Sequence, residues 1–223
     1  MKKYFVEFVG TLFLILIIGL TSNPVAIGFG LTVLVYMGAH ISGAHYNPVV
    51  SLAFIIKKDI NRKDFIFYVL SQITGATIGA LLIYFLKDSV VEIQPNLSSS
   101  IYQILISEIL FTFLLVFVIL NVATHPNLED NSFYGFAIGL TVMAGAFSVG
   151  PISGAVFNPA VSLGPTLSHL IIGDGISKDT EERIRVVGPD IENIHYKLYS
   201  YQSDSQDLNY LYFDYIKQPG HVY

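Results

Sequence analysis

Asn47 and Asn158 each stand directly before a proline, and each Asn-Pro pair follows a turn of small residues. An asparagine can cap a helix that begins with proline, because its side-chain oxygen accepts a hydrogen bond from the first helical turn. The same side chain carries two amide N–H donors that can hold the oxygen of a water molecule. We therefore expect each asparagine both to begin a helix and to offer a donor to a small polar solute.

Two carboxylates, Glu7 and Glu108, lie inside long apolar segments. A carboxylate at membrane depth favours a functional role such as a proton relay. A relay needs a second titrating group nearby, and none is evident in the sequence. The matched placement of the two residues instead favours a structural role, in which each carboxylate accepts hydrogen bonds from the backbone of a nearby re-entrant loop.

The remaining polar residues do not suggest a metal site or a catalytic centre. The chain has no cysteine, which excludes disulfides and cysteine-based metal sites. No cluster of His, Asp and Glu has the spacing of metal ligands, and no nucleophile–base pair stands out. His45 stands two residues before Asn47, so it is a candidate for the same solute site, and it is interpreted as holding the loop rather than as a ligand. We expect no metal, no cofactor and no enzymatic activity.

The composition indicates an integral membrane protein. Hydrophobic residues make up 52% of the 223 residues and charged residues 13%, against about 25% charged in soluble domains. No basic patch suggests binding to nucleic acid. We expect the chain to cross the cell membrane, plasma or inner, several times, with the bilayer as its surroundings. The basic segment 57–64 is placed in the cytoplasm because loops rich in Lys and Arg stay on that side.

Two kinds of apolar segment must position these residues. The runs that follow the prolines, residues 47–57 and 158–172, are short: ten helical residues span roughly 15 Å, half of a hydrocarbon core of about 30 Å. Two half-helices meeting end to end would make one crossing with a break, which is tolerated only in protein or beside a watery cavity. Segments long enough to cross alone cover residues 4–20, 25–41, 65–86, 101–120 and 133–149.

An internal repeat runs through these segments. The matching stretches are Glu7-x-x-x-Thr11 with Glu108-x-x-x-Thr112, Gly30-Leu31-Thr32-Val33 with Gly139-Leu140-Thr141-Val142, and Ile-Ser-Gly-Ala-x-x-Asn-Pro at 41–48 and 152–159. Three spans separate the matching points, so the second copy enters the membrane from the opposite side. An inverted repeat of this kind places a functional site near the membrane midplane, where the copies meet.

These features resemble the aquaporin, or major intrinsic protein, family over about residues 1–173. The resemblance implies an all-α integral membrane fold, an inverted repeat of transmembrane helices with two re-entrant half-helices. It also implies a passive channel for water and small neutral solutes, assembled as a homotetramer. Pro48 and Pro159 would then support the loops together with Glu7 and Glu108. The first box reads Asn-Pro-Val, where the family usually has Asn-Pro-Ala.

The resemblance also assigns the selectivity filter to four positions by their distance from the Asn-Pro boxes. They are Ile27, Ala146, Ala155 and Val161. Family water channels usually carry an aromatic residue, a His, a small residue and an Arg there, whereas all four residues here are apolar. This pattern is similar to that of plant tonoplast intrinsic proteins and implies water together with urea, ammonia or glycerol. Ser162, where glycerol facilitators usually carry Asp, argues weakly against dedicated glycerol transport.

The end of the chain departs from the family pattern. The repeat predicts a sixth span near residues 176–197, but seven or more charged residues stand there. Each charge at the bilayer centre costs about 2.5–3.5 kcal/mol, which excludes a span. The sixth span is therefore interpreted as missing, and residues 174–223 are interpreted as a polar tail that is weakly structured or prone to interaction. A frame artefact after residue 173 is the alternative.

Electrostatics favour neutral solutes. The N-terminus of each half-helix carries about half a positive charge, and two such ends facing each other would repel cations and protons. Two alternatives stay open beside the channel. One is a non-conducting or truncated membrane scaffold whose pore lacks the sixth helix. The other is a proton-coupled transporter that uses Glu7 and Glu108.

Overall fold

The computed structural model describes residues 1–91, 93–128 and 130–172, and all regular elements within them are helical. The elements are α1 (Lys2–Thr21), α2 (Pro24–Ser42), α3 (Pro48–Lys57), α4 (Arg62–Lys87), α5 (Ile101–Thr124), a 3-10 turn (Pro126–Leu128), α6 (Tyr134–Ser153) and α7 (Pro159–Ile172). Residues Met1–Ile171 form one compact unit. The polar tail predicted at 174–223 lies outside the described residues, and the boundary at residue 173 stays a prediction.

Side-chain caps explain where several helices begin. The Oδ1 atom of Asn23 accepts a hydrogen bond from Val25 N at 2.9 Å, just before Pro24 opens α2. Ser100 forms a reciprocal capping box with Gln103 at the start of α5. These short polar residues satisfy N–H groups that have no partner inside the first helical turn. The sequence signals at these helix starts are therefore local.

The predicted end of the fifth span at Val149 is wrong, because α6 continues to Ser153 through Pro151. Proline lacks an N–H and normally interrupts a helix. Here it lies in the last turn, and the helix continues for only two residues beyond it. The helix instead ends at Gly154, which has a left-handed φ of 84° and donates its N–H to the carbonyl oxygen of Gly150 at 3.0 Å.

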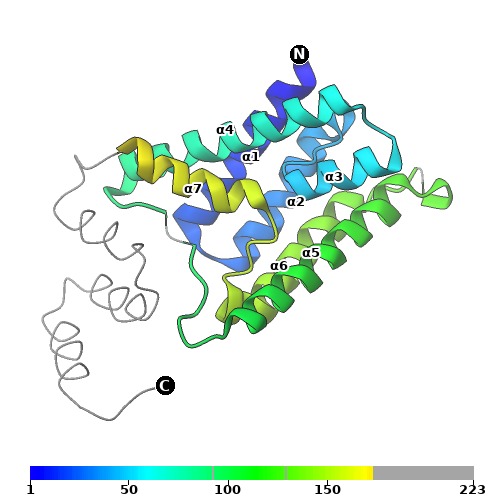
Figure 1. The fold of residues 1–223 in the computed structure, drawn as a ribbon. Helices are drawn as coiled ribbons and strands as arrows, with labels where there is room; N and C mark the ends of the chain where they lie inside the picture. The colour runs from blue at the N-terminus through cyan, green and yellow to red at the C-terminus, as the bar shows by residue number, and fades with distance from the viewer. Residues whose placement is uncertain (92, 129, 173–223) are drawn as a thin grey trace, which may run out of the picture. The chain divides into compact units, whose positions relative to one another are not determined.

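The helices pack as the inverted repeat predicts. Helix α1 packs against α2 as its counterpart α5 packs against α6, and the counterparts α2 and α6 pack against each other. Helix α1 also packs against α4. Figure 1 shows the short helices α3 (cyan) and α7 (yellow) in the middle of the arrangement. Within the described residues, five helices are long and apolar enough to cross a membrane, while α3 and α7 are shorter. The predicted fold, an all-α membrane protein with two half-helices, is confirmed.

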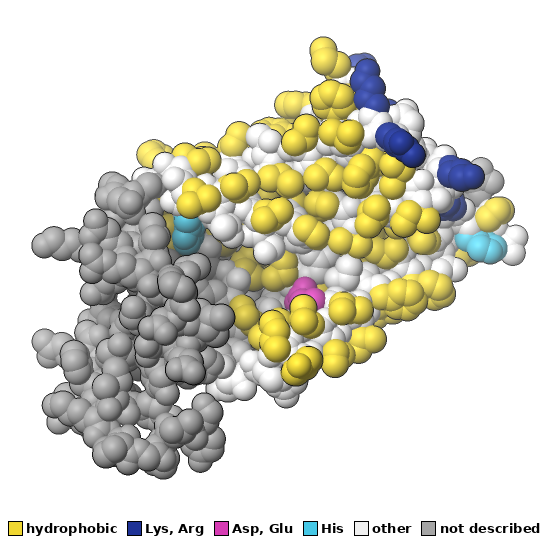
Figure 2. Space-filling model, viewed as in Figure 1, with side chains coloured by type: hydrophobic (Ala, Val, Ile, Leu, Met, Phe, Trp, Pro, Cys, Tyr) yellow, Lys and Arg dark blue, Asp and Glu magenta, His cyan; other side chains and the backbone are white. Residues whose placement is uncertain are grey.

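The outer surface suits a bilayer. Hydrophobic side chains are spread over the described face in Figure 2, and Lys and Arg gather at one end. Large exposed side chains such as Phe5, Phe85 and Ile109 are 64–80% exposed. In water such a surface would aggregate, whereas in lipid it costs nothing to leave it uncovered. The chain is therefore an integral membrane protein.

Two glycines set the closest approach of α2 and α6. A side-chain carbon added at Gly28 would lie 2.9 Å from the carbonyl oxygen of Gly139. One added at Gly139 would overlap both Thr32 and the carbonyl oxygen of Gly28. The backbones touch because neither residue has a side chain, which is a common way for membrane helices to gain packing energy.

Replacing one of these glycines should loosen this crossing. We expect Gly139→Ala to lower the free energy of unfolding by about 1–3 kcal/mol, because overpacking forces the helices apart. Thermal unfolding in detergent, followed by circular dichroism, measures the loss. Gly150→Ala on the same helix is the control, since its added carbon meets only the Cβ of Ala155 at 3.9 Å. Equal destabilisation by both substitutions would contradict the proposed crossing.

Candidate functional site

The two loops before α3 and α7 have the same backbone conformation. Their left-handed residues occur in pairs 111 positions apart: Gly43 and Gly154 (φ 85° and 84°), Ala44 and Ala155 (50° and 51°), and Tyr46 and Phe157 (both 48°). Non-glycine residues adopt positive φ only when their surroundings hold them there. The repeat seen in the sequence is thus reproduced residue by residue at the loops.

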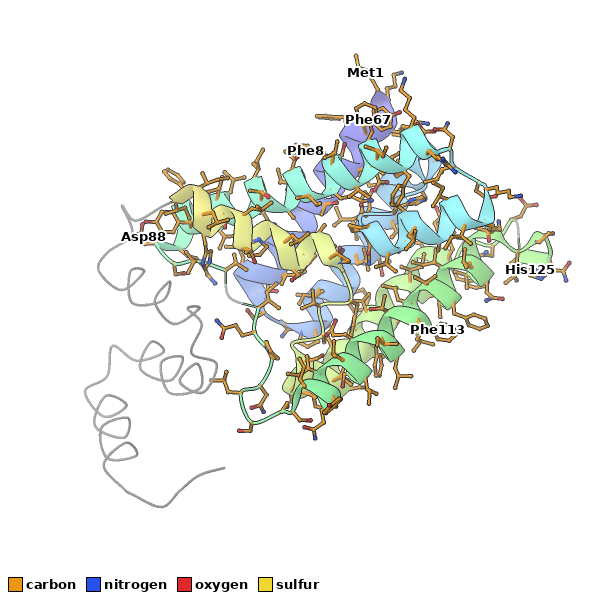
Figure 3. The ribbon with its side chains drawn as sticks, viewed as in Figure 1. Met1, Phe8, Phe67, Asp88, Phe113 and His125 are labelled. Atoms are coloured by element: carbon orange, nitrogen blue, oxygen red, sulfur yellow. The ribbon has the colours of Figure 1, made fainter. Side chains whose placement is uncertain are left out.

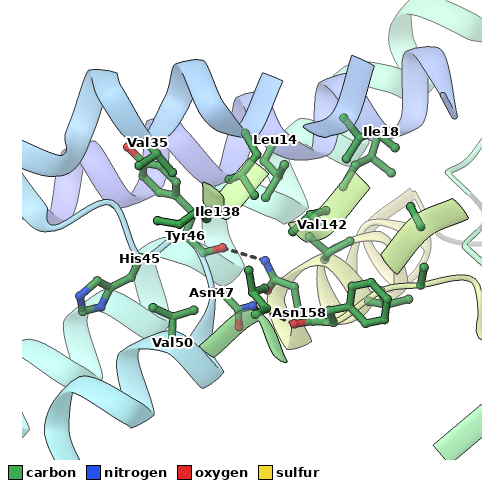
Figure 4. A pocket seen from close by; sticks show the side chains of 18 of the residues that line it. Leu14, Ile18, Val35, His45, Tyr46, Asn47, Val50, Ile138, Val142 and Asn158 are labelled. Atoms are coloured by element: carbon green, nitrogen blue, oxygen red, sulfur yellow. Dashed lines mark hydrogen bonds between the residues drawn. The ribbon is translucent and has the colours of Figure 1, made fainter. Parts of the chain in front are cut away.

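Asn47 and Asn158 join the two loops by reciprocal hydrogen bonds. Each Oδ1 caps its own half-helix, accepting from Val49 N at 2.8 Å for Asn47 and from Ala160 N at 3.0 Å for Asn158. The Nδ2 atom of Asn158 donates to the carbonyl oxygen of Tyr46 at 2.8 Å, the bond drawn in Figure 4.

Asn47 makes the equivalent hydrogen bond to the second loop. The Nδ2 atom of Asn47 donates to the carbonyl oxygen of Phe157 at 2.8 Å. An amide nitrogen carries two hydrogens, so each asparagine has a second N–H beyond the one in these bonds. The N-termini of α3 and α7 therefore meet at one point, where their partial positive charges add.

Glu7 anchors the first loop. It is fully buried and accepts four hydrogen bonds. Its Oε1 atom accepts from Ser42 Oγ at 2.6 Å and His45 N at 3.0 Å. Its Oε2 atom accepts from Tyr46 N at 2.7 Å and Gln72 Nε2 at 2.8 Å. The carboxylate thus satisfies two backbone N–H groups that the loop cannot pair internally.

Glu108 makes the matching contacts with the second loop, but fewer of them. It accepts hydrogen bonds from Val156 N at 3.1 Å and Phe157 N at 2.8 Å. It is partly buried, whereas Glu7 is wholly buried. Within the described residues, no counterpart of Gln72 covers it. The two halves of the site are therefore alike in backbone and unlike in their outer support.

His45 both lines the cavity and contacts the first loop, the two roles that the sequence suggested for it. It lines the cavity described below and is only 5% exposed. Its Nδ1 atom lies 3.0 Å from Ser51 Oγ, and its ring packs on Phe54 with centroids 4.3 Å apart. These contacts hold the ring between the first loop and α3. They agree with the interpretation of His45 as a loop residue, whose role in permeation stays a prediction.

A cavity of about 90 Å³ lies where the loops meet, with space for several water molecules. The structure brings all seven predicted pore residues to its wall. They are Ile27, His45, Asn47, Ala146, Ala155, Asn158 and Val161. Neither Glu7 nor Glu108 is among its lining residues. Apart from the asparagine amides, His45 and the loop carbonyl groups, the wall is largely apolar.

Much of this wall is not marked by any motif in the sequence. Leu14 and Ile18 come from α1, and Leu115 and Ile119 come from α5. No motif marks them. A helical spacing of three to four residues is their only signal, and it does not say which face of a membrane helix points inward. In the described part of the chain, no group of three His, Cys, Asp or Glu residues could hold a metal ion.

Comparison with known proteins agrees with this geometry. The family model described as Major intrinsic protein matches residues 1–191. Nodulin-26 of Glycine max is 37% identical over 187 residues, covering 76% of this chain and 68% of that protein. Aquaporin NIP3-1 of Arabidopsis thaliana is 39% identical over 149 residues, covering 63% of this chain and 46% of that protein.

A further relative and a solved structure extend the comparison. Aquaporin NIP1-1 of Zea mays is 40% identical over 152 residues, covering 66% of this chain and 54% of that protein. The chain spans about half the length of several curated relatives that it matches. The aquaglyceroporin from Plasmodium falciparum has a TM-score of 0.67 at 20% identity, covering 94% of this chain and 98% of that one. At this identity the match shows the fold alone.

Proposed function

Because this chain belongs to the major intrinsic protein family, we propose that it is a passive membrane channel for water and small uncharged solutes. The observation that carries the proposal is the pair of asparagine amides at the meeting point of α3 and α7, on the wall of one cavity. The second N–H of each amide can donate to a passing oxygen atom. A solute at this point would replace its hydrogen bonds to water with hydrogen bonds from these amide donors.

The same arrangement disfavours cations. Two helix N-termini direct their partial positive charges at the cavity, so a cation entering it would meet repulsion from both. A neutral solute meets only donors and apolar walls. In this proposal Glu7 and Glu108 hold the loops and take no part in permeation, since neither lines the cavity. We propose no enzymatic role.

The filter positions set the proposed solute range. Ile27, Ala146, Ala155 and Val161 all line the cavity and carry no charge or hydrogen-bond donor on their side chains. A filter of this kind does not select by fixed polar contacts, so we propose that urea, ammonia and glycerol pass as well as water. The relatives named above carry NIP or nodulin names. The similarity to tonoplast intrinsic proteins therefore rests on these four positions alone.

The wider context of the channel is proposed from the family. We propose that residues 1–173 form the channel domain, that the protein resides in a plasma or inner membrane, and that it assembles as a homotetramer with one pore per protomer. The residues after 173 are proposed to form a separate polar tail.

Stopped-flow light scattering of proteoliposomes tests the function. Under an osmotic gradient we expect water permeability severalfold above that of empty liposomes, with additional permeability to urea and glycerol. A passive pore needs no second gradient, so an imposed pH difference should not drive solute uptake. Uptake that follows the pH difference would instead support a proton-coupled transporter.

A second candidate function has one observation in its favour. An open groove of about 440 Å³ runs beside α3 and α5, and Glu108 lies on its wall. If the groove stays open in the bilayer, lipid could reach the second loop and the pore would not be sealed. The protein would then be a non-conducting scaffold. Permeability equal to that of empty liposomes for water, urea and glycerol alike would favour this alternative.

A further inference from the structure

An open groove of about 440 Å³ lies between α3 and α5. It is lined by residues of α3 between Val49 and Ile56 and by residues of α5 between Glu108 and Val116. We call it the α3–α5 groove. Helix α5 is the least covered of the five long helices, with 17% of its apolar window buried against 44% for α4. The groove is therefore a surface that other chains or lipid can reach.

Comparison of the two repeats shows that the α3–α5 groove lacks a covering helix among the described residues. In the first repeat, α4 covers the equivalent surface of α1. Side-chain carbons added at Gly75 and Gly79 of α4 would meet Phe8, Leu12 and Ile15 of α1. The counterparts of these three residues on α5 are Ile109, Phe113 and Val116, and all three line the groove. Phe113 is 64% exposed (Figure 3).

The crossing of α4 and α7 also has an equivalent position in the groove. Helix α4 crosses α7 where a carbon added at Gly164 would meet Ala76. The counterpart of Gly164 on α3 is Ala53, which also lines the groove. The groove thus lies where the repeat would place a helix related to α4. In the described residues no helix occupies this place, and the segment that the repeat assigns to it carries seven or more charges.

Glu7 and Glu108 differ in their side-chain hydrogen bonds. Gln72 of α4 donates from its Nε2 atom to Glu7 and, at 3.0 Å, to Ser51. The counterparts of these acceptors are Glu108, on the groove wall, and Ser162, which is exposed. A carboxylate open to hydrocarbon is expensive, and membrane carboxylates pair with a partner. Among the described residues, Glu108 on the groove wall therefore has no counterpart of the amide donor found in the first repeat.

We propose that the α3–α5 groove is a docking site for one transmembrane helix of a separate polypeptide. This helix is apolar over about 20 residues, the length that crosses a bilayer. It carries a Gln or Asn near its middle, whose amide donates to Glu108. It also has small residues where it crosses α3, because Ala53 occupies the position of the glycine at the equivalent crossing. This interaction surface goes beyond the proposed transport function.

Other occupants fit the groove less well. A second copy related by a two-fold axis through the groove would bring two Glu108 carboxylates together, and like charges repel. Lipid chains fill space but cannot donate a hydrogen bond. Residues 176–197 carry too many charges to lie at this depth. Of these occupants, a helix with an amide donor satisfies both the apolar walls and the carboxylate.

Photocross-linking in mild detergent micelles tests the proposal directly. The full chain carries p-benzoylphenylalanine in place of Phe113 and is titrated with a synthetic peptide of the α4 sequence, Arg62–Lys87. The peptide serves as the probe because α4 is the symmetry mate of the missing helix. In an inverted repeat the missing helix would run in the opposite direction to α4, and in micelles the peptide can bind in either direction. Mass spectrometry identifies the photoproduct. We expect a saturable adduct with the peptide.

Two substitutions isolate the predicted hydrogen bond. The peptide carrying Gln72→Leu should bind about threefold to fifteenfold more weakly than the unsubstituted peptide, the range of one hydrogen bond between membrane helices. In protein carrying Glu108→Leu, the two peptides should bind equally. The same photoprobe in place of Leu110, which is 57% exposed but does not line the groove, should give little adduct.

Each other outcome overturns the proposal. Equal binding of the unsubstituted and the Gln72→Leu peptides to unmodified protein would remove the amide–carboxylate contact. Photoproducts that join two copies would assign the groove to a dimer. Photoproducts with residues 173–223, or only with detergent, would assign it to the chain itself or to lipid. None of these measurements depends on transport, so failure here and failure of the channel proposal are distinguishable.

Discussion

Glu7→Leu is expected to unfold the protein at temperatures where the matched substitution Glu108→Leu leaves it largely folded. Both substitutions remove one carboxylate from equivalent positions of the repeat. Glu7 accepts four hydrogen bonds at a fully buried position, whereas Glu108 accepts two at a partly buried one. The pair therefore compares the same chemical change in two environments.

The expected difference follows from the donors left behind. Leucine at position 7 would strand the N–H groups of His45 and Tyr46 and one hydrogen of the Gln72 amide in a dry interior. The Ser42 hydroxyl keeps an acceptor, the carbonyl oxygen of Gly38 at 3.5 Å. Each of the three stranded donors costs about 1–3 kcal/mol, so we expect a loss of roughly 3–9 kcal/mol. The upper part of this range reaches the whole stability of many domains.

At position 108 the same change strands only two backbone donors, those of Val156 and Phe157, at a position that is partly buried. We expect less than half the loss found for Glu7→Leu. Thermal unfolding in detergent, followed by circular dichroism and by loss of the monodisperse peak in gel filtration, gives both values. Equal losses would mean that the asymmetry of the two halves is absent in solution.

The local parts of this architecture could be predicted from the sequence. The Asn-Pro boxes predict where α3 and α7 begin, because the capping asparagine and the proline at the first helical position both favour a helix start within one turn. The long apolar runs give the five crossings, because the bilayer imposes a minimum length. The spacing of the repeat even gives the inverted topology. For the helix starts and the crossings, the signal lies within the element that it predicts.

The contacts between the halves could not be predicted in this way. Nothing in either box says that the Nδ2 atom of Asn47 binds the carbonyl oxygen of Phe157, because that bond joins residues 110 positions apart. Residue types alone likewise could not show that Gln72 reaches Glu7. The sequence indicated a missing span, but only the packing shows that its place is a groove with Glu108 on the wall.

Ala146→Phe is expected to abolish permeation to water, urea and glycerol together. Ala146 lies on α6 and lines the cavity of about 90 Å³. A protein cavity of about 150 Å³ holds one benzene molecule, so a phenyl ring directed into the smaller cavity would fill it and exclude water. Stopped-flow permeability should fall at least tenfold, close to the value of empty liposomes.

The control for this substitution lies two residues away on the same helix. Ala144 is exposed on the outer surface and does not line the cavity, so Ala144→Phe makes the same chemical change toward lipid. It should leave permeability within about twofold of the unmodified protein, because surface changes away from special features have small effects. If both variants conduct equally well, solutes do not pass by Ala146. The path would then have to lie outside the cavity where Asn47 and Asn158 meet, and the channel mechanism proposed from that meeting point would fail.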